Sequence, residues 1–211
     1  MSDFTTWRSL VDGEEIGVIP DAVVEDFERS NPLDDYSGDL TNYSVQSTTT
    51  FEGDNALIGE NRAGEIISTS GLDAYPQAGE IFSYRTRIQG DRPISVGLFG
   101  VQDTDNYYGA YINKDELRLL KDELGGALDD SAISIATDIW YLIRVYWDVD
   151  GNDEITVELW EDEPINERGE GTLVDSVTAT DAEYKTGGIG FFNFHDQNSP
   201  GESFWDYWII E

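Results

Sequence analysis

The side chains that could carry out chemistry are few in kind, because the chain contains no cysteine and a single histidine, His195. Without cysteine, there is neither a disulfide framework nor a zinc–thiolate site. Any Ser–His–Asp arrangement would have to use His195, yet the sequence has no G-x-S-x-G elbow to present a serine nucleophile. We therefore place His195 in a loop after a strand and treat it as a candidate ligand contact rather than a catalytic base.

Carboxylates are the abundant functional groups. The chain has 44 Asp and Glu residues against 12 Lys and Arg residues, which gives a formal net charge of −32. Self-repulsion of this size opposes folding in dilute buffer, whereas molar salt shortens the Debye length to about 3 Å and screens the repulsion. The only lysines are Lys114, Lys121 and Lys185. This acidic, lysine-poor composition is typical of a halophilic protein, and it lacks the basic stripe that binding to nucleic acid requires.

Aromatic side chains beside polar turns are the candidate ligand contacts, because their ring faces stack on sugar C–H faces while neighbouring Asp or Asn residues bond hydroxyls. In the segment 140–147, alternate apolar residues define a core face, and the opposite face carries Arg144 outward together with two aromatic residues. That opposite face is predicted to bind a ligand or another subunit. The predicted ligand contacts are Tyr107, Tyr108, Trp140, Tyr146 and His195.

The pattern of residues 23–211 predicts strands joined by turns. About a dozen short segments rich in aromatic and β-branched residues alternate with Gly, Asp and Asn turns, and no long helical period is present. The clearest pair is 140–147 with 154–160, joined through Asp150-Gly151, a strong hairpin dipeptide. We therefore predict an all-β fold, an antiparallel β-sandwich of the jelly-roll type, as a single domain.

The acidic turn at 148–153 resembles the start of an EF-hand loop. An EF-hand needs flanking helices and a bidentate Glu at loop position 12, whereas this turn has predicted strands on both sides and Leu159 at that position. We interpret 148–153 as a hairpin turn.

Residues 1–22 differ from the rest of the chain and are interpreted as an N-terminal arm. Their apolar residues are scattered, and the segment ends near Pro20. The arm is predicted either to pack on its own domain or to anchor the protein to a partner. The first ten residues lack the apolar run of a signal peptide, and no apolar stretch approaches the ~18 residues of a membrane span. We expect synthesis in the cytoplasm without a signal peptide and no membrane span.

Several short motifs follow one another in a recognisable order over about residues 22–211. They are DFE at 26–28, YSGD at 36–39, FEG at 51–53, FSYRTRI at 82–88, GLFGVQDTDNYYGAYI at 97–112, WYLIRVYWDVDG at 140–151, GGIGFF at 187–192 and FWDYWII at 204–210. This order resembles the concanavalin A-like lectin and glucanase superfamily, in its laminin-G-like and carbohydrate-binding-module-like branches. The resemblance implies a jelly roll of two antiparallel sheets, one of them concave, with glycans bound on the concave face or at the loop rim.

The same resemblance implies a structural Ca²⁺ where the first and last strands run side by side. The matching positions are Glu28 on the first strand and Asp206 on the last, with Asp26 or Asp39 as additional ligands. Ca²⁺ takes six to eight oxygen ligands, and a cation would relieve the repulsion of paired carboxylates. The alternative is that these are solvated acids on a very acidic surface.

The catalytic pattern of the laminarinase-like branch, E-x-D-x-x-E or E-x-D-x-E on one strand, is absent. Glu158 and Glu161 flank Trp160, but residues three apart on a strand point to opposite faces, so they cannot form the carboxylate pair of a retaining glycosidase. We therefore expect a binding protein rather than an enzyme, with a glycoside hydrolase as an alternative.

The segment WRSLVDGEEIGVIPD, together with the acidic composition, resembles virion proteins of haloarchaeal tailed viruses. This resemblance implies a virion surface or appendage protein that binds glycans on the host surface, with residues 1–22 docking to a second copy or to another virion subunit. The alternative is a purely structural assembly protein of the virion.

Overall fold

The computed structural model describes residues 10–11, 14–15, 22–60, 63–68, 75–164, 169–193 and 201–211. Most of the predicted arm and the candidate contact His195 lie outside these ranges. Within the arm, β1 (Leu10–Val11) pairs antiparallel with β2 (Glu14–Glu15). The helices of the described residues are the 3-10 turns η1 (Pro32–Asp35) and η2 (Leu40–Asn42). No helix in these ranges has the length and hydropathy to cross a membrane.

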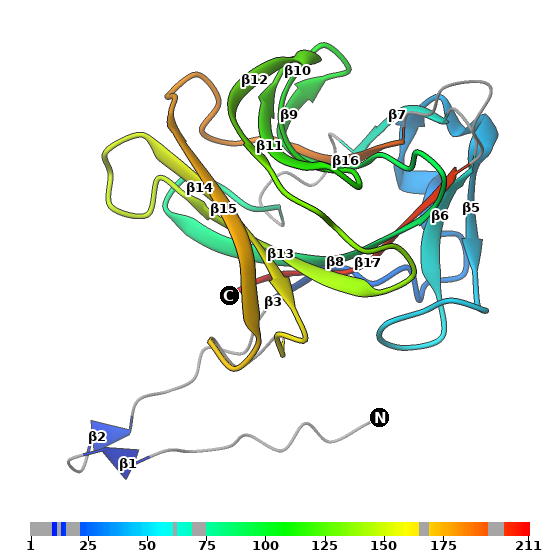
Figure 1. Ribbon diagram of the computed structural model, residues 1–211, viewed down its shortest axis with the longest axis horizontal. Helices are drawn as coiled ribbons and strands as arrows, with labels where there is room; N and C mark the ends of the chain where they lie inside the picture. Colours follow the sequence, from blue (N-terminus) through cyan, green and yellow to red (C-terminus); the bar gives the residue numbers. More distant parts are fainter. Residues whose placement is uncertain are drawn as a thin grey trace.

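Two antiparallel sheets stack face to face, which confirms the predicted all-β sandwich (Figure 1). The seven-stranded sheet has the order β12 (Glu123–Ala132), β11 (Glu116–Lys121), β10 (Asn106–Ile112), β9 (Ser95–Asp103), β16 (Gly188–Asn193), β7 (Ala63–Ser68) and β4 (Ser37–Gly38). The eight-stranded sheet has the order β15 (Thr172–Thr180), β14 (Glu154–Glu161), β13 (Trp140–Trp147), β8 (Glu80–Gly90), β17 (Gly201–Ile210), β6 (Ala56–Glu60) and β5 (Tyr43–Gln46), with β3 (Ala22–Glu25) also pairing with β17.

The layer between the sheets consists of the alternate residues that the sequence assigns to a core face. Trp208 lies at its centre, stacked on Tyr84 with ring centroids 4.2 Å apart and packed against Phe82 at 5.8 Å. Burying each such side chain contributes about 1.5–3 kcal/mol. The core-facing residues of β13, all buried, are Tyr141, Ile143, Val145 and Trp147.

The predicted hairpin of β13 and β14 is confirmed over its whole length, with Val145 opposite Val157. In the connecting turn, the Asp153 N–H donates to the Asp148 carboxylate at 2.6 Å. The Lys185 ammonium binds both carboxylates, at 2.8 Å from Asp148 and 2.6 Å from Asp153. A lysine therefore balances the charge of this turn, in keeping with its interpretation as a hairpin rather than a calcium loop.

The strand β12 is where the sequence prediction was wrong. The pattern predicts a weak strand over 131–136, whereas the strand spans Glu123–Ala132. Gly125, Gly126 and several acidic residues have low strand propensity, which hides the strand from a sequence pattern. Because β12 pairs only with β11, at the edge of its sheet, it tolerates such residues.

A second hydrophobic cluster covers the outer face of the seven-stranded sheet, the face turned away from the other sheet. Its residues alternate with core residues along the same strands, so Leu98 belongs to the outer cluster while Phe99 belongs to the core. Outward-facing residues of a sandwich are ordinarily polar. This face therefore differs from an ordinary solvated sheet surface. The buried members of the cluster are Ile67, Val96, Leu98, Val101, Tyr107, Tyr111, Leu120 and Phe192.

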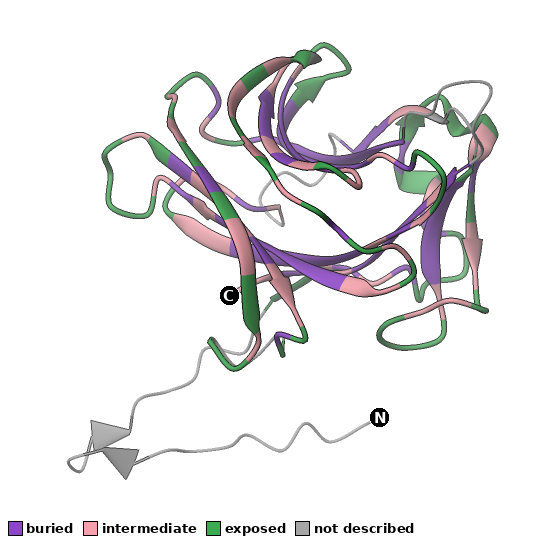
Figure 2. Cartoon of the chain, viewed as in Figure 1, coloured by how far each residue is buried: buried purple, intermediate pink, exposed green. Residues whose placement is uncertain are grey.

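The outer face of the eight-stranded sheet differs from the prediction for Arg144. The sequence places Arg144 on the outward side of β13, which is correct, but its side chain is fully buried rather than solvated. Figure 2 shows that much of the central part of this sheet is buried. The flanking aromatic residues Trp140 and Tyr146 are half-buried, as expected.

Candidate functional site

A groove lies on the outer face of the seven-stranded sheet, and its lining comes from both ends of that sheet. Asp39 and Glu65 belong to the β4–β7 end, while Asp122 and Glu123 belong to the β11–β12 end. Strands lie about 4.8 Å apart, so a flat sheet would hold these ends roughly 25 Å apart. A single cavity of about 470 Å³ bordered by both ends requires the sheet to curve around it, and this curvature is visible in Figure 1.

Tyr107, on β10, lines the groove and is only 2% exposed. Within the described part of the chain, no residue hydrogen-bonds its hydroxyl. Burial raises the pKa of Tyr107 well above that of a free tyrosine, and the charges of Glu65 and Asp122 raise it further. The hydroxyl is therefore neutral at physiological pH and can both donate and accept a hydrogen bond.

Short local contacts fix the acidic rim at the β4–β7 end. The Asp39 N–H donates to the Glu65 carbonyl at 3.0 Å, and the Asp39 carboxylate accepts from the Thr41 N–H at 3.2 Å. Gly64 leaves room for this arrangement, because a Cβ there would lie 2.9 Å from the Asp39 Cβ. The two acids are thus held side by side at the entrance of the groove.

Two turns fix the rim at the opposite end. The Asp122 N–H donates to the Tyr107 carbonyl at 2.9 Å, and the Asp122 carboxylate accepts from the Tyr184 hydroxyl at 2.6 Å. Asp122 has a φ of +66°, which allows the sharp turn between β11 and β12. In the β9–β10 turn, the Asp105 N–H donates to the Asp103 carboxylate at 2.8 Å. The rim is therefore held in place before any ligand binds.

The groove offers acceptor oxygens over an aromatic surface. Five carboxylates line it, and Tyr107 and Phe192 supply the aromatic part; the described lining contains no Lys or Arg. Carboxylates accept hydrogen bonds and repel anions, so the groove suits a ligand with many hydroxyl donors or a positive charge. The five carboxylates are those of Asp39, Glu65, Asp105, Asp122 and Glu123.

Of the predicted ligand contacts, Tyr107 lies in the groove and Tyr108 does not. Adjacent strand residues point to opposite faces, so only one of the two can line the groove. Tyr108 is buried in the core between the sheets, where its hydroxyl donates to the Asp181 carboxylate and accepts from the Tyr184 N–H at 3.2 Å. Its polar atom is therefore already used by the fold.

Trp140 and Tyr146 lie on the other sheet, at opposite ends of β13. Trp140 packs against Phe51 and Phe204, with ring centroids 6.1 and 6.3 Å away. Tyr146 lines a smaller hollow of about 250 Å³ beside the β13–β14 turn. At about 3.4 Å per residue, their positions are roughly 20 Å apart along the strand. The structure does not bring these two residues together, nor does it bring either to Tyr107.

The implied calcium ligands occupy positions that use their oxygens otherwise. The first and last strands do run side by side, since β3 pairs with β17. However, Glu28 accepts the N–H groups of Asp54 and Asn55, each at 2.7 Å. Asp206 accepts the N–H groups of Phe51 at 2.8 Å and of Glu52 at 3.1 Å.

The two remaining positions, Asp26 and Asp39, do not complete a cation site. Asp26 accepts the N–H of Glu28 at 3.1 Å, while Asp39 lies beside β7 in the other sheet. Within the described ranges, no group of three or more Asp, Glu or His side chains is placed to hold a metal. The predicted set therefore does not fit the oxygen cage that Ca²⁺ requires.

Sequence reasoning missed most of the groove. Glu65, Asp122 and Glu123 carry no local motif that separates them from other surface acids. The available signal was the alternation of Tyr107 with Tyr108, which shows that one of the pair must leave the core, but not which residues surround it.

The fold has counterparts among solved structures. A legume lectin-like domain from Entamoeba histolytica aligns with a TM-score of 0.52 at 12% identity, covering 82% of this chain and 90% of that one. A protein of unknown function from Shewanella oneidensis aligns with a TM-score of 0.50 at 15% identity, covering 89% of this chain and 86% of that one. An endo-β-1,4-glucuronan lyase from the fungus Trichoderma reesei aligns at only 0.46 and 11% identity, covering 82% and 88%. No protein-family model and no curated protein matches the sequence.

These alignments establish the architecture. The chain has a jelly-roll sandwich of the concanavalin A-like superfamily, as its motif order predicts. Proteins of this architecture include both lectins and enzymes, so the function has to be argued from the groove itself.

Proposed function

We propose that the protein is a non-enzymatic, lectin-like carbohydrate-binding protein and that the acid-rimmed groove is its binding site. The observation that carries the proposal is the Tyr107 hydroxyl, which is buried against a cavity of about 470 Å³ without a hydrogen-bond partner among the described residues. A buried polar group ordinarily has a partner. A ligand hydroxyl in the groove would supply it.

The chemistry of the groove favours an uncharged saccharide. Each carboxylate of the rim accepts hydrogen bonds from sugar hydroxyls, and charge-assisted hydrogen bonds of this kind are among the stronger ones. The ring of Phe192 adds apolar surface to the lining. Sulfated or uronic acid polymers would place negative charge against Glu65 and its neighbours, which Coulomb repulsion disfavours.

The proposal that the protein is not an enzyme rests on the missing catalytic pattern in the sequence. The groove acids come from separate turns and strand ends rather than from one strand. Incubation with laminarin- or agar-like polymers should therefore release no reducing sugar. Measurable release would establish the glycoside hydrolase alternative instead.

The proposed setting follows from composition and from sequence resemblance. With a net charge of −32, we expect folding and binding to require high salt. A virion surface or appendage protein that binds host glycans, anchored through residues 1–22, remains our prediction for its biological role. Deleting residues 1–22 should prevent incorporation into particles while leaving glycan binding unchanged, since the groove is built from residues 39–192.

A glycan array in molar salt, carrying neutral and acidic oligosaccharides, tests the groove. We expect binding to neutral glycans, and a loss of about tenfold or more in the Tyr107→Phe variant, which removes one hydroxyl and keeps the ring. The matched control is Tyr146→Phe, which removes a hydroxyl from the other sheet and should bind as the wild type does. Wild-type binding by Tyr107→Phe would remove the groove from consideration.

A further inference from the structure

A second pocket, of about 460 Å³, opens on the outer face of the eight-stranded sheet, on the opposite side of the sandwich from the groove. Much of its wall is apolar, formed by Phe51, Ile139, Trp140 and Pro164. Phe51 is 40% exposed and meets Trp140 edge to face, with ring centroids 6.1 Å apart. Two aromatic rings thus border an open space that also contains one basic side chain, Arg85.

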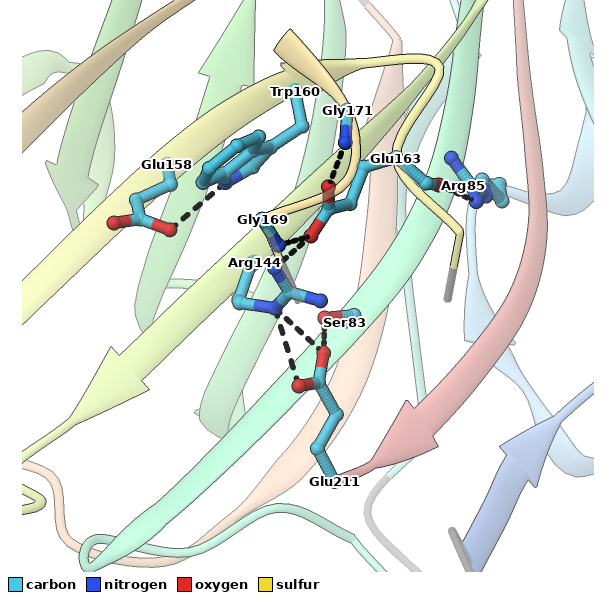
Figure 3. A network of polar contacts seen from close by, with 9 residues as sticks. All are labelled: Ser83, Arg85, Arg144, Glu158, Trp160, Glu163, Gly169, Gly171 and Glu211. Atoms are coloured by element: carbon cyan, nitrogen blue, oxygen red, sulfur yellow. Dashed lines mark hydrogen bonds and ion pairs between the residues drawn. The ribbon is translucent and has the colours of Figure 1, made fainter. Parts of the chain in front are cut away.

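Arg85 is a buried cation without a carboxylate partner in the described part of the chain. Its side chain is almost fully buried, and its one hydrogen bond there runs from Nη2 to the backbone carbonyl of Glu163 (Figure 3). Its Nε is buried and has no partner. The guanidinium carbon lies 4.0 Å from the centroid of the Phe51 ring. In a chain with 44 acidic residues, an unpaired buried arginine requires an explanation.

The neighbouring Arg144 shows what full pairing looks like on the same sheet face. Its Nε lies 2.8 Å from the Glu211 carboxylate and its Nη1 lies 2.9 Å from the Glu163 carboxylate. Glu163 also accepts the N–H groups of Gly169 and Gly171 (Figure 3). The carboxylate closest in the fold to Arg85 is therefore committed to Arg144, and only its backbone oxygen serves Arg85.

Asp206 is also directed away from Arg85. The two residues face each other across β8 and β17. Nevertheless, the Asp206 carboxylate accepts the N–H groups of Phe51 and Glu52. This contact fixes the loop that carries Phe51, so Asp206 positions the pocket wall instead of neutralising the arginine.

An unpaired buried charge is costly, and the electrostatics of the pocket reflect that cost. Burial, together with the nearby charge of Arg144, lowers the pKa of Arg85 to about 10. The guanidinium stays protonated at neutral pH. A carboxylate entering the pocket would gain a charge-assisted hydrogen bond in a partly desolvated site.

We propose that this pocket binds a carboxylate carried on a six-membered ring, either a hexuronate or an aromatic acid, with the carboxylate on Arg85 and the ring against Trp140 and Phe51. The proposal does not depend on the groove, which lies on the other sheet and has the opposite charge. The two sites would take different ligand chemistries: uncharged hydroxyl-rich ligands in the groove, and acids in the Arg85 pocket.

Isothermal titration of the full chain in molar salt tests the pocket with three probes: glucuronate, glucose and benzoate. Glucuronate and glucose differ chiefly in the carboxylate. We expect glucuronate or benzoate to bind, and the one that binds identifies the ring; glucose should bind this pocket at least about tenfold more weakly than glucuronate. Failure of both acids to bind would overturn the proposal.

Variants assign the binding to Arg85. Arg85→Met should weaken acid binding by about tenfold or more, and Arg85→Lys, which keeps the charge but not the planar fork, should weaken it less. Arg87→Met is the matched control, because Arg87 lies two residues away on the same strand face and forms an ion pair with Asp138 outside the pocket. Acid binding by Arg85→Met at wild-type strength would also overturn the proposal.

The failure of each proposal can be told apart from that of the other. Tyr107→Phe should leave acid binding unchanged, and Arg85→Met should leave the binding of neutral glycans unchanged. Circular dichroism in high salt checks that each variant remains folded. If Arg85→Met were unfolded, Trp140→Ala would test the pocket through its wall and should weaken acid binding by a similar factor.

Discussion

The outer faces of the two sheets handle charge in opposite ways. On the seven-stranded sheet, the centre of the face is apolar and the carboxylates stand around it at turns and strand ends, as Asp105 and Asp122 do. On the eight-stranded sheet, two arginines, Arg85 and Arg144, are buried on the central strands β8 and β13. Acids at the margin keep their hydration and cost little in salt, whereas buried cations depend on named partners.

This difference indicates where ligand chemistry is available on each face. The acidic rim can accept hydrogen bonds without any rearrangement, because its acids are fixed by backbone contacts. The arginine face has donors to offer only where pairing is incomplete, which is at Arg85 and not at Arg144. The comparison can be tested through stability as well as through binding.

The largest effect is expected for Glu163→Gln. It removes the negative charge from a carboxylate that is fully buried and pairs with Arg144. Breaking a buried pair by removing one partner costs about 3–5 kcal/mol, and denaturant unfolding in high salt measures it. The matched control, Glu161→Gln, changes a half-buried acid two residues away and should shift stability by less than about 0.5 kcal/mol. Equal effects would mean that the buried network does not stabilise this face.

The next effect is expected for Asp206→Asn and depends on pH. Burial raises the pKa of Asp206 from 3.8 to about 6, although the N–H groups of Glu52 and Phe51 oppose the rise. Because the folded-state pKa exceeds the unfolded one, the stability this group contributes is present below about pH 4 and is lost as the pH rises through about 6.

The stability of Asp206→Asn relative to the wild type should therefore increase from about pH 4 to about pH 7 by up to about 3 kcal/mol. Unfolding of both proteins across that range, at constant high salt, measures the difference. Asp26→Asn is the control, because Asp26 is an acid near β3 and should show no such rise. A flat difference for Asp206→Asn would contradict the burial argument.

A smaller effect of opposite sign is expected for Arg85→Met. Removing a buried charge that has no carboxylate partner should leave stability unchanged or raise it by about 1 kcal/mol. Arg144→Met, by contrast, should lose about 3–5 kcal/mol, since it abandons two buried carboxylates. Thermal unfolding of the two variants side by side tests the contrast, and equal losses would show that Arg85 is structurally as well paired as Arg144.

The smallest effect is expected for Tyr107→Phe. The lost hydroxyl has no described partner in the fold, so stability should change by less than about 0.5 kcal/mol while glycan binding is lost. Tyr108→Phe serves as the control, because its hydroxyl bonds Asp181 and its removal should destabilise the fold by about 1–3 kcal/mol. A large loss of stability in Tyr107→Phe would identify the hydroxyl as structural.

The sequence by itself determined the fold class and the buried face of its clearest strands. Alternation in 140–147 assigned Tyr141, Ile143, Val145 and Trp147 to the core, and Asp150-Gly151 marked the hairpin, because both signals depend on residues close together in the chain. The pairing of the first and last strands followed from the order of motifs. The edge strand β12 escaped prediction because its glycines and acids resemble a loop.

Only the tertiary structure decided which distant side chains meet. The groove draws Asp39, Glu65, Tyr107 and Asp122 together across a curved sheet, and Arg144 finds Glu211 at a separation of 67 residues. Strand periodicity assigns a residue to a face but does not fix the order of strands within the sheet or the curvature of that sheet. For the same reason, the sequence marked Arg144 as outward-facing but could not show that it is paired while Arg85 is not.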